Sequence, residues 1–350
     1  MNGRKERPDV IGWGITRNCN LSCPHCYSAS TRRLKDELTT RECLKLVDSM
    51  IDLGVQTIGW TGGEPLLRYD LEEIVFYAKS KGNIRSGVTT NGIPLTERRA
   101  LSLRQAGVSF IQISLDGSTP ERNAQMRNAT KEDFHRIIGA LRTCQKLGFK
   151  MSLAMMLGVE NLDDGPEFIR LARREGVPYV RFCGFVPLGR GRKTEIVRRL
   201  CFTQETLPRL KSFFEKALSN SNPIVMPDPG FGPLPTDYCF HPCVSGVKTF
   251  YLSSVGDVYP CTSLLDKKFL VGNVRERTLQ DLWNDPGMTS LSSFPKEKIT
   301  GYCSECRYLE SCRGGCRGIT FAHTNDLHAS FPLCLSRLES RRPFPAYPAT

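Results

Sequence analysis

The chain has 350 residues, of which 40% are hydrophobic and 24% charged, which is enough apolar surface for one large and one small domain. This composition excludes intrinsic disorder and collagen-like structure. No stretch approaches the roughly 20 consecutive apolar residues that cross a bilayer. The N-terminal residues also lack an apolar stretch after their charges, so we expect neither a membrane anchor nor a secretory signal. We therefore expect a cytoplasmic protein with no membrane partner.

Fifteen cysteines and a net charge of +12 are the unusual features of the composition. Disulfides are rare in a reducing cytoplasm and an odd count would leave one cysteine unpaired, so metal or redox chemistry becomes the leading explanation. The positive charge is compatible with nucleic acid, an acidic surface or an acidic substrate, and equally with scattered solvated lysines and arginines. Because no known nucleic-acid-binding module accompanies the charge, we expect no nucleic-acid partner.

Short apolar runs alternate with amphipathic stretches over the first half of the chain. Predicted strands cover residues 10–15, 56–60, 85–90, 110–115, 150–156 and 179–185. Predicted helices between them cover residues 40–53, 71–81, 97–106, 131–147 and 165–175. This alternation indicates parallel βαβ units, hence an α/β fold with an open doubly wound sheet or a full or partial barrel. Both architectures place function at the carboxyl ends of the strands.

The composition changes after residue 200. A further helix is expected over 203–219, and then proline and glycine accumulate between 222 and 238, which predicts a linker or extended bridge. The region after it is rich in cysteine and has one short helical segment near 278–283, so metal ligands could replace a large core. We place the units at 8–200, 201–238 and 239–340, and expect a disordered proline-rich tail at 341–350.

Three cysteines, Cys19, Cys23 and Cys26, fall within eight residues directly after the first predicted strand. Three thiolates in one loop can bind three irons of a four-iron cubane and leave the fourth iron open for a substrate or cofactor. Zinc would usually require a fourth protein ligand or a catalytic water. The loop is therefore the first candidate site for an inorganic centre.

This spacing, with His25 just before the last cysteine, closely resembles the radical S-adenosylmethionine (SAM) superfamily. The resemblance implies a partial (β/α)6 TIM-like barrel over residues 8–200 and a 4Fe-4S cluster held by Cys19, Cys23 and Cys26. In that family the open iron binds SAM, and an electron from the reduced cluster splits SAM to give a 5′-deoxyadenosyl radical. The resemblance also implies that His25 lies near the adenine.

Segments after the next three predicted strands also resemble the family. The residues that the resemblance places around SAM are His25, Gly62, Gly63, Glu64, Pro65, Asn91, Ser114 and Asp116. Glycines let the backbone approach a ligand closely, and Glu64 can accept hydrogen bonds from the amino group of SAM. Asn91, Ser114 and Asp116 could instead act as turn or helix-cap residues.

The C-terminal cysteines resemble the SPASM extension of radical SAM enzymes, which typically binds two auxiliary 4Fe-4S clusters. The resemblance assigns one cluster to Cys239, Cys243, Cys261 and Cys316, and the other to Cys303, Cys306, Cys312 and Cys334. In this interleaved arrangement each cluster would close a long loop. Short paired spacings also suit tetrahedral zinc, so a zinc ribbon stays open as an alternative.

Four cysteines have no place in these sets. Cys43 and Cys144 lie on the apolar faces of predicted helices, where cysteine serves as a small buried hydrophobe. Cys183 and Cys201 are ambiguous, and we expect structural roles for both.

The resemblance implies an enzyme that abstracts a substrate hydrogen and oxidises a peptide or protein, with a flavodoxin or ferredoxin as electron donor. Only 18 residues precede Cys19, so we expect no N-terminal peptide-binding module, and a leader peptide would require a separate partner or none. Thr262 stands where sulfatase-maturing relatives have an aspartate after the cysteine, which argues against that particular oxidation.

Two alternatives remain from the sequence. The first is oxidative decarboxylation or side-chain modification of a tetrapyrrole in haem or haem d1 formation, in which Arg190, Arg192 and Lys193 could pair with propionates. These three residues could equally form a solvated loop. The second is a non-catalytic iron–sulfur or zinc-binding protein, which would leave the segment from Gly62 to Pro65 without a purpose.

Overall fold

The computed structural model describes residues 7–219, 222–228, 231 and 243–339. Its strands form one sheet with the order β10-β9-β8-β1-β2-β3-β4-β5-β6-β7, which is not closed over the described residues. The strands are β1 (Val10–Thr16), β2 (Thr57–Gly62), β3 (Arg85–Thr90), β4 (Val108–Ser114), β5 (Lys150–Leu157), β6 (Tyr179–Gly184), β7 (Ile224–Pro227), β8 (Thr249–Leu252), β9 (Asp257–Tyr259) and β10 (Gly272–Asn273). Neighbouring strands from β8 through β1 to β7 are parallel, so the expected α/β partial barrel is confirmed.

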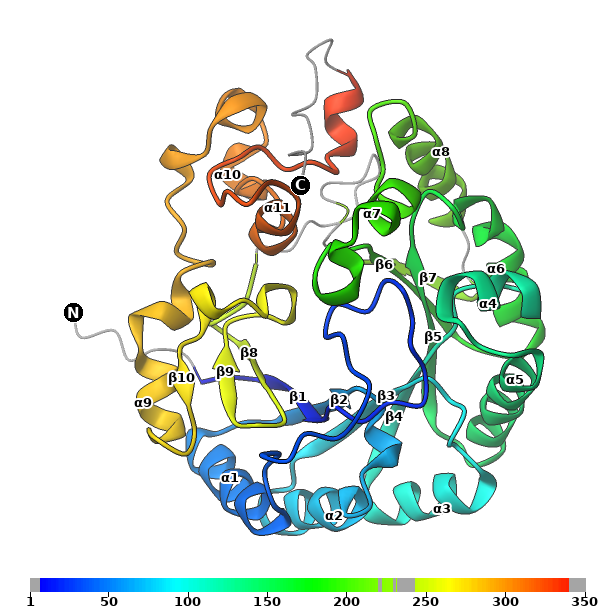
Figure 1. Cartoon of the computed structure of the whole chain (residues 1–350), viewed down its shortest axis with the longest axis vertical. Coiled ribbons are helices and arrows are strands. Elements are labelled where there is room, and N and C mark those ends of the chain that lie inside the picture. Colours follow the sequence, from blue (N-terminus) through cyan, green and yellow to red (C-terminus); the bar gives the residue numbers. More distant parts are fainter. Residues whose placement is uncertain (1–6, 220–221, 229–230, 232–242, 340–350) are drawn as a thin grey trace.

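Helices cover the outside of this sheet. They are α1 (Thr40–Leu53), α2 (Leu71–Gly82), α3 (Glu97–Ala106), α4 (Pro120–Arg127), α5 (Lys131–Lys146), α6 (Gly165–Arg174), α7 (Thr194–Leu200), α8 (Leu207–Ala217), α9 (Leu279–Asn284), α10 (Leu309–Cys312) and α11 (Arg317–Thr324). Figure 1 shows α1, α2, α3, α5 and α6 outside the curved sheet, while the chain between β1 and α1 runs across its inside. Among the described helices, none has the length and apolar character needed to cross a membrane.

Local sequence signals explain why the helices begin and end where they do. In α1, Thr39 accepts a hydrogen bond from the backbone of Glu42 while the Glu42 carboxylate binds the Thr39 backbone, which is a capping box. The helix ends at Gly54, whose φ of 83° lies in the left-handed region that glycine adopts freely. Cys43 in α1 and Cys144 in α5 are fully buried, as expected of small apolar side chains.

The segment expected to be a bridge contributes a strand to the barrel. Residues 224–227 form β7, which pairs in parallel with β6 in the register Tyr179 to Ile224. Proline is tolerated there because Pro227 is the last residue of a strand at the edge of the sheet. The short helices α4, α7 and α11 were not expected either; α4 buries only Asn123 and Met126, so its apolar pattern is weak.

The cysteine-rich region is joined to the barrel through the same sheet. Strand β8 pairs in parallel with β1, so the chain after residue 243 adds strands to the sheet beside the first barrel strand. On the surface, Arg275 Nε lies 2.7 Å from Glu42 Oε1 and links the segment after β10 to α1. This hydrogen bond from Arg275, with the capping hydrogen bond from Thr39, lowers the pKa of Glu42 to about 2.

Candidate functional site

A cavity of about 510 Å³ lies at the carboxyl ends of the parallel strands. One wall carries all three cysteines of the loop between β1 and α1, which we call the cysteine loop (residues 17–31). The other walls come from the ends of β2 to β6 and from Cys316 of the C-terminal region. The cavity therefore brings residues from both halves of the chain to the functional edge of an α/β sheet.

The cysteine loop is fixed at its neck and at its tip. At the neck, the backbone of Cys19 donates to the carbonyl oxygen of Thr31 at 3.1 Å. Arg190 donates from Nε to the carbonyl oxygen of Cys23 at the tip and from Nη1 to that of Ser30 next to the neck, both at 2.9 Å. The loop that presents the three thiols is thus held by the segment that follows β6.

The three thiols lie in a partly desolvated environment beside two guanidinium groups. Burial raises the pKa of Cys19 to about 11 and also raises the pKa of Cys23, against which nearby Arg127 acts. Burial opposes ionisation of Cys26 too, but hydrogen bonds from Ser28 and Ser30 and the charge of Arg190 lower the pKa of that thiol. Arg127 was not expected from the sequence, and its burial next to the thiols equips the cavity to receive anions.

This donor set fits an iron–sulfur cluster, because soft thiolates are the ligands that such clusters take and the adjacent guanidinium groups offset their negative charge. Among the residues that the structure describes, no three His, Cys, Asp or Glu side chains are arranged to hold a single metal ion.

The glycine pair at the end of β2 forms part of the cavity wall and lies very close to the end of β1 and the start of the cysteine loop. A Cβ atom on Gly63 would lie 2.3 Å from the carbonyl oxygen of Asn18, and one on Gly62 would lie 2.4 Å from that of Thr16. Gly62 also has a φ of 141°, which L side chains rarely adopt. The close neighbour of these two glycines in this structure is the protein's own backbone, at the end of β1 and in the cysteine loop.

Glu64 and Pro65 are buried behind this wall. Glu64 accepts a hydrogen bond from Thr90 Oγ1 and another from the backbone of Asn91, both at 2.7 Å. Burial raises the pKa of Glu64 to about 6. In this structure its carboxylate connects the ends of β2 and β3, whereas Asn91 itself and Ser114 line the cavity as expected.

Asp116 is the centre of a buried network. Its Oδ2 atom lies 2.9 Å from His25 Nε2 and 3.1 Å from Arg127 Nη1, and its Oδ1 accepts from the backbone of Met156 at 2.7 Å. Burial opposes ionisation, but Arg127 and His25 hold the pKa of the Asp116 carboxyl below its usual value. Asp116 therefore fixes the orientation of His25 and Arg127, which both line the cavity.

A second polar group, formed by Arg181, Cys183 and Asp228, lines another part of the cavity. Arg181 Nη2 lies 3.0 Å from Asp228 Oδ2. The sequence did not single out Arg181 or Asp228. The alternation along β6 carried a signal for Arg181, since the apolar residues on either side of it, Val180 and Phe182, are buried.

Of the three basic residues considered for substrate binding, the structure places only Arg190 at the cavity. Arg190 lines the cavity and holds the cysteine loop, as described above. Arg192 pairs with Asp266 at 3.1 Å with 55% of its side chain exposed, and Lys193 is also exposed. Neither of these two residues faces the cavity among the described residues.

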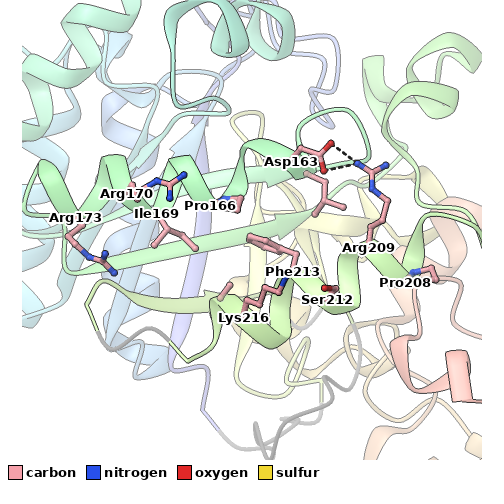
Figure 2. A pocket seen from close by; sticks show the side chains of 12 residues that line it. Asp163, Pro166, Ile169, Arg170, Arg173, Pro208, Arg209, Ser212, Phe213 and Lys216 are labelled. Carbon is pink, nitrogen blue, oxygen red and sulfur yellow. Dashed lines mark hydrogen bonds and ion pairs between the residues drawn. The ribbon is translucent and has the colours of Figure 1, made fainter.

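A second hollow of about 670 Å³ lies between α6 and α8, lined by side chains such as Ile169, Arg170 and Phe213 (Figure 2). At one end of this hollow, Arg209 Nη2 lies 2.7 Å from Asp163 Oδ1 (Figure 2). This hollow contains none of the residues expected to bind a cofactor, so the smaller cavity is the candidate active site.

The C-terminal cysteines gather into two groups. Cys316 lies near Cys261 and Cys243, which together with burial raise its pKa. Cys334 lies near Cys303, Cys312 and Cys306, and burial raises its pKa to about 12. Cys239, expected as the fourth ligand of the first group, lies outside the described residues.

Two family models match the chain. The model of the Radical SAM superfamily matches residues 13–172, and the SPASM model, an iron-sulfur cluster-binding domain, matches residues 243–307. The chain therefore contains a radical SAM domain followed by a SPASM domain. Because the first match covers the cavity walls from β1 to α6 and the second covers four of the C-terminal cysteines, this radical SAM enzyme uses SAM and iron–sulfur clusters.

Curated relatives of the radical SAM enzyme match over nearly its whole length. It is 29% identical over 357 residues to an AdoMet-dependent heme synthase of Methanosarcina barkeri, covering 96% of this chain and 99% of that protein. It is 29% identical over 337 residues to mycofactocin maturase MftC of Mycobacterium tuberculosis, covering 94% and 83% of the two chains. The structure of Streptococcus suis SuiB bound to S-adenosylmethionine shares the fold, with a TM-score of 0.72, 17% identity and coverage of 94% and 77%.

Proposed function

We propose that Cys19, Cys23 and Cys26 hold a 4Fe-4S cluster at which SAM is reductively cleaved, and that the enzyme then abstracts a hydrogen atom from its substrate. The observation that carries this proposal is the presence of all three thiols in one cavity with the Gly62 and Gly63 wall. The bound cluster and SAM supply the radical chemistry, while the protein supplies binding, orientation and exclusion of water.

The residues around the thiols have different roles in binding and orienting SAM. We propose that Asn91 and Ser114 bind SAM, that His25 lies near its adenine, and that Arg127 provides positive charge for the carboxylate of SAM. Asp116 keeps His25 and Arg127 in place through the contacts described above. Glu64 and Pro65 support the wall of Gly62 and Gly63 from behind. Glu64 can contact the SAM amino group only through an opening in the backbone of this wall.

We further propose two auxiliary 4Fe-4S clusters in the SPASM domain, one on Cys243, Cys261 and Cys316 with Cys239, and one on Cys303, Cys306, Cys312 and Cys334. Cys316 also lines the catalytic cavity, so the first of these clusters would lie next to the substrate. That position suits the removal of an electron from a substrate radical, which makes the overall reaction oxidative. A flavodoxin or ferredoxin would reduce the SAM-binding cluster.

A peptide or protein is the substrate that we place first. The cavity volume of about 510 Å³ is that of a site for one drug-sized ligand. The cluster and SAM would share this cavity with the substrate, which favours entry of one side chain over entry of a whole macrocycle. One relative at 29% identity is a maturase, mycofactocin maturase, which agrees with this choice. If the substrate carries a leader peptide, we propose that a separate partner binds the leader.

A tetrapyrrole is the second candidate, because the match to a heme synthase covers 99% of that protein. In this case only a propionate arm would enter the cavity while the macrocycle stays at its mouth.

The two candidates are separated by 5′-deoxyadenosine release from the reconstituted, anaerobic enzyme with SAM and dithionite. One series contains iron-coproporphyrin III, and the other contains short peptides encoded beside the gene. Stimulated release with a mass change in a peptide supports the first candidate. Stimulated release with loss of carbon dioxide from the porphyrin alone would replace it with the second.

A further inference from the structure

The polar group formed by Arg181, Cys183 and Asp228 has no role in the cysteine loop or in the proposed SAM site. Arg181 and Cys183 are two residues apart on β6, so their side chains lie on the same side of the sheet. Phe182 between them points the other way and packs against Phe213, with ring centroids 5.1 Å apart. The strand therefore directs a cation and a thiol into the cavity and an aromatic ring into the core.

The guanidinium of Arg181 is only partly engaged by its neighbours. It has five N–H donors in a planar fork, and Asp228 accepts from Nη2 at 3.0 Å. The side chain of Cys183 forms a second hydrogen bond with Arg181. Nevertheless 43% of the Arg181 side chain remains accessible, so donors of the fork face the cavity.

Asp228 is the single carboxylate of this group. Burial raises the pKa of Cys183 to about 12, so its thiol is neutral near pH 7. The group therefore contains one cation and one anion. Because the thiol is neutral, the guanidinium of Arg181 can bind a second anion.

Strand pairing alone does not explain the ion pair. The backbone of Asp228 already donates to the carbonyl oxygen of Phe182 at 2.8 Å, which fixes the end of β7 against β6. A half-exposed ion pair adds little stability, about 1 kcal/mol or less. By contrast, a guanidinium that faces a cavity can bind a carboxylate through two parallel hydrogen bonds, which gives both energy and orientation.

We propose that Arg181 binds a carboxylate of the substrate and that Asp228 holds the guanidinium in place for it. This inference rests on the proposed function, since it assumes that the cavity receives the substrate. A peptide carboxylate and a tetrapyrrole propionate offer the same chemistry, so the anchor fits either candidate. It would direct an acidic side chain toward the cavity that also contains the cysteine loop.

The test measures binding to the anaerobic holoenzyme with SAM by equilibrium dialysis. One arm compares iron-coproporphyrin III with its tetramethyl ester, and the other compares acetyl-Ala-Glu-Ala-amide with acetyl-Ala-Gln-Ala-amide. We expect the carboxylate form to bind about tenfold more tightly in the arm that matches the substrate, the ratio that corresponds to about 1.4 kcal/mol. No preference for carboxylate in either arm, or no binding in either, would overturn the proposal.

Two substitutions separate an anchor from a merely structural pair. Arg181→Gln should reduce the tenfold ratio to nearly one, and Arg181→Lys should restore part of it. Asp228→Asn keeps a side-chain oxygen that can accept the hydrogen bond from Arg181 but removes the competing negative charge, so binding of the carboxylate form should tighten severalfold. A structural role of the ion pair predicts weaker binding in both variants. Weaker binding in Asp228→Asn as well as in Arg181→Gln would therefore contradict the anchor.

Arg170→Gln is the matched control, because Arg170 lines the separate hollow between α6 and α8 (Figure 2). Its guanidinium pairs with Glu167. It should leave the preference for carboxylate unchanged. Release of 5′-deoxyadenosine by the wild-type enzyme without substrate keeps the two proposals apart. If that release is absent, the proposed function fails; if it is present without a carboxylate preference, only the anchor fails.

Discussion

Arg190 donates from Nε to the carbonyl oxygen of Cys23 at 2.9 Å, although 167 residues separate them in the sequence. The same side chain binds the carbonyl of Ser30, and its backbone N–H donates to the carbonyl of Cys26 at 3.0 Å. These three contacts fix the curvature of the cysteine loop against the segment that follows β6. The loop geometry therefore depends on the end of the barrel as well as on its beginning.

Substitution of Arg190 by Gln should weaken cluster binding. Each lost hydrogen bond from a charged donor is worth about 1.5–3 kcal/mol, so the loop should become mobile and bind less iron after reconstitution. We expect loss of up to about 4 of the irons and at least a tenfold drop in 5′-deoxyadenosine release. Arg192→Gln is the control, because Arg192 pairs with Asp266 outside the cavity. Equal iron content in both variants would show that Arg190 does not support the loop.

Gly63→Ala should disrupt the cavity wall. The added Cβ would lie 2.3 Å from the carbonyl oxygen of Asn18, so the wall and the cysteine loop must move apart. We expect a loss of stability of about 1–3 kcal/mol and little SAM cleavage. Thermal unfolding and 5′-deoxyadenosine release measure the two effects.

Gly139→Ala provides the opposite expectation for the same chemical change. Gly139 lies within α5, and a Cβ there would meet no atom within 4 Å. Alanine should stabilise the helix by about 0.5–1 kcal/mol and leave SAM cleavage intact. Destabilisation of both variants to the same degree would contradict the role given to the Gly63 contact.

His323 should make stability depend on pH. Burial lowers its pKa to about 4, and its Nδ1 lies 3.9 Å from Cys201 Sγ, whereas in an unfolded chain its pKa is about 6.5. The unfolded state therefore binds a proton first as the pH falls. The contribution of His323 is complete above about pH 6.5 and is lost progressively down to about pH 4, by up to about 3 kcal/mol.

The measurement compares thermal midpoints of wild type and His323→Gln at several pH values in this window. The variant should show a smaller fall between pH 6.5 and pH 4.5, and His135→Gln on the exposed side of α5 should behave like wild type. Identical pH profiles for wild type and His323→Gln would show that burial of His323 has no such effect.

Much of the barrel could be predicted because its signals are local. The apolar period of α1, closed by Thr39 and Gly54, defines a helix without any tertiary information. Strand β7 could not be predicted in this way, because its four residues follow one proline and end on another and show no readable alternation, and only pairing with β6 makes them a strand. Likewise α4 shows few apolar residues and is stabilised by tertiary contacts.

The same difference between local sequence signals and tertiary contacts applies to the candidate site. The cysteines were predictable because their spacing is a chemical constraint that stands in the sequence itself. The partners of Asp116 were not, since its contacts with His25 and Arg127 join residues that are 91 and 11 positions away. Arg181 and Asp228 were missed for the same reason, because only the pairing of β6 with β7 brings them together.

The central claim is that Cys19, Cys23 and Cys26 hold the cluster that cleaves SAM. Iron content and 5′-deoxyadenosine release are measured together, after anaerobic reconstitution, for wild type and for the variant with all three cysteines replaced by Ala. We expect about 12 irons in the wild type, as three cubanes require, and about 8 in the variant, with no SAM cleavage. A variant that keeps its full iron content and cleaves SAM at the wild-type rate, or a wild type with zinc in place of iron, would contradict the claim.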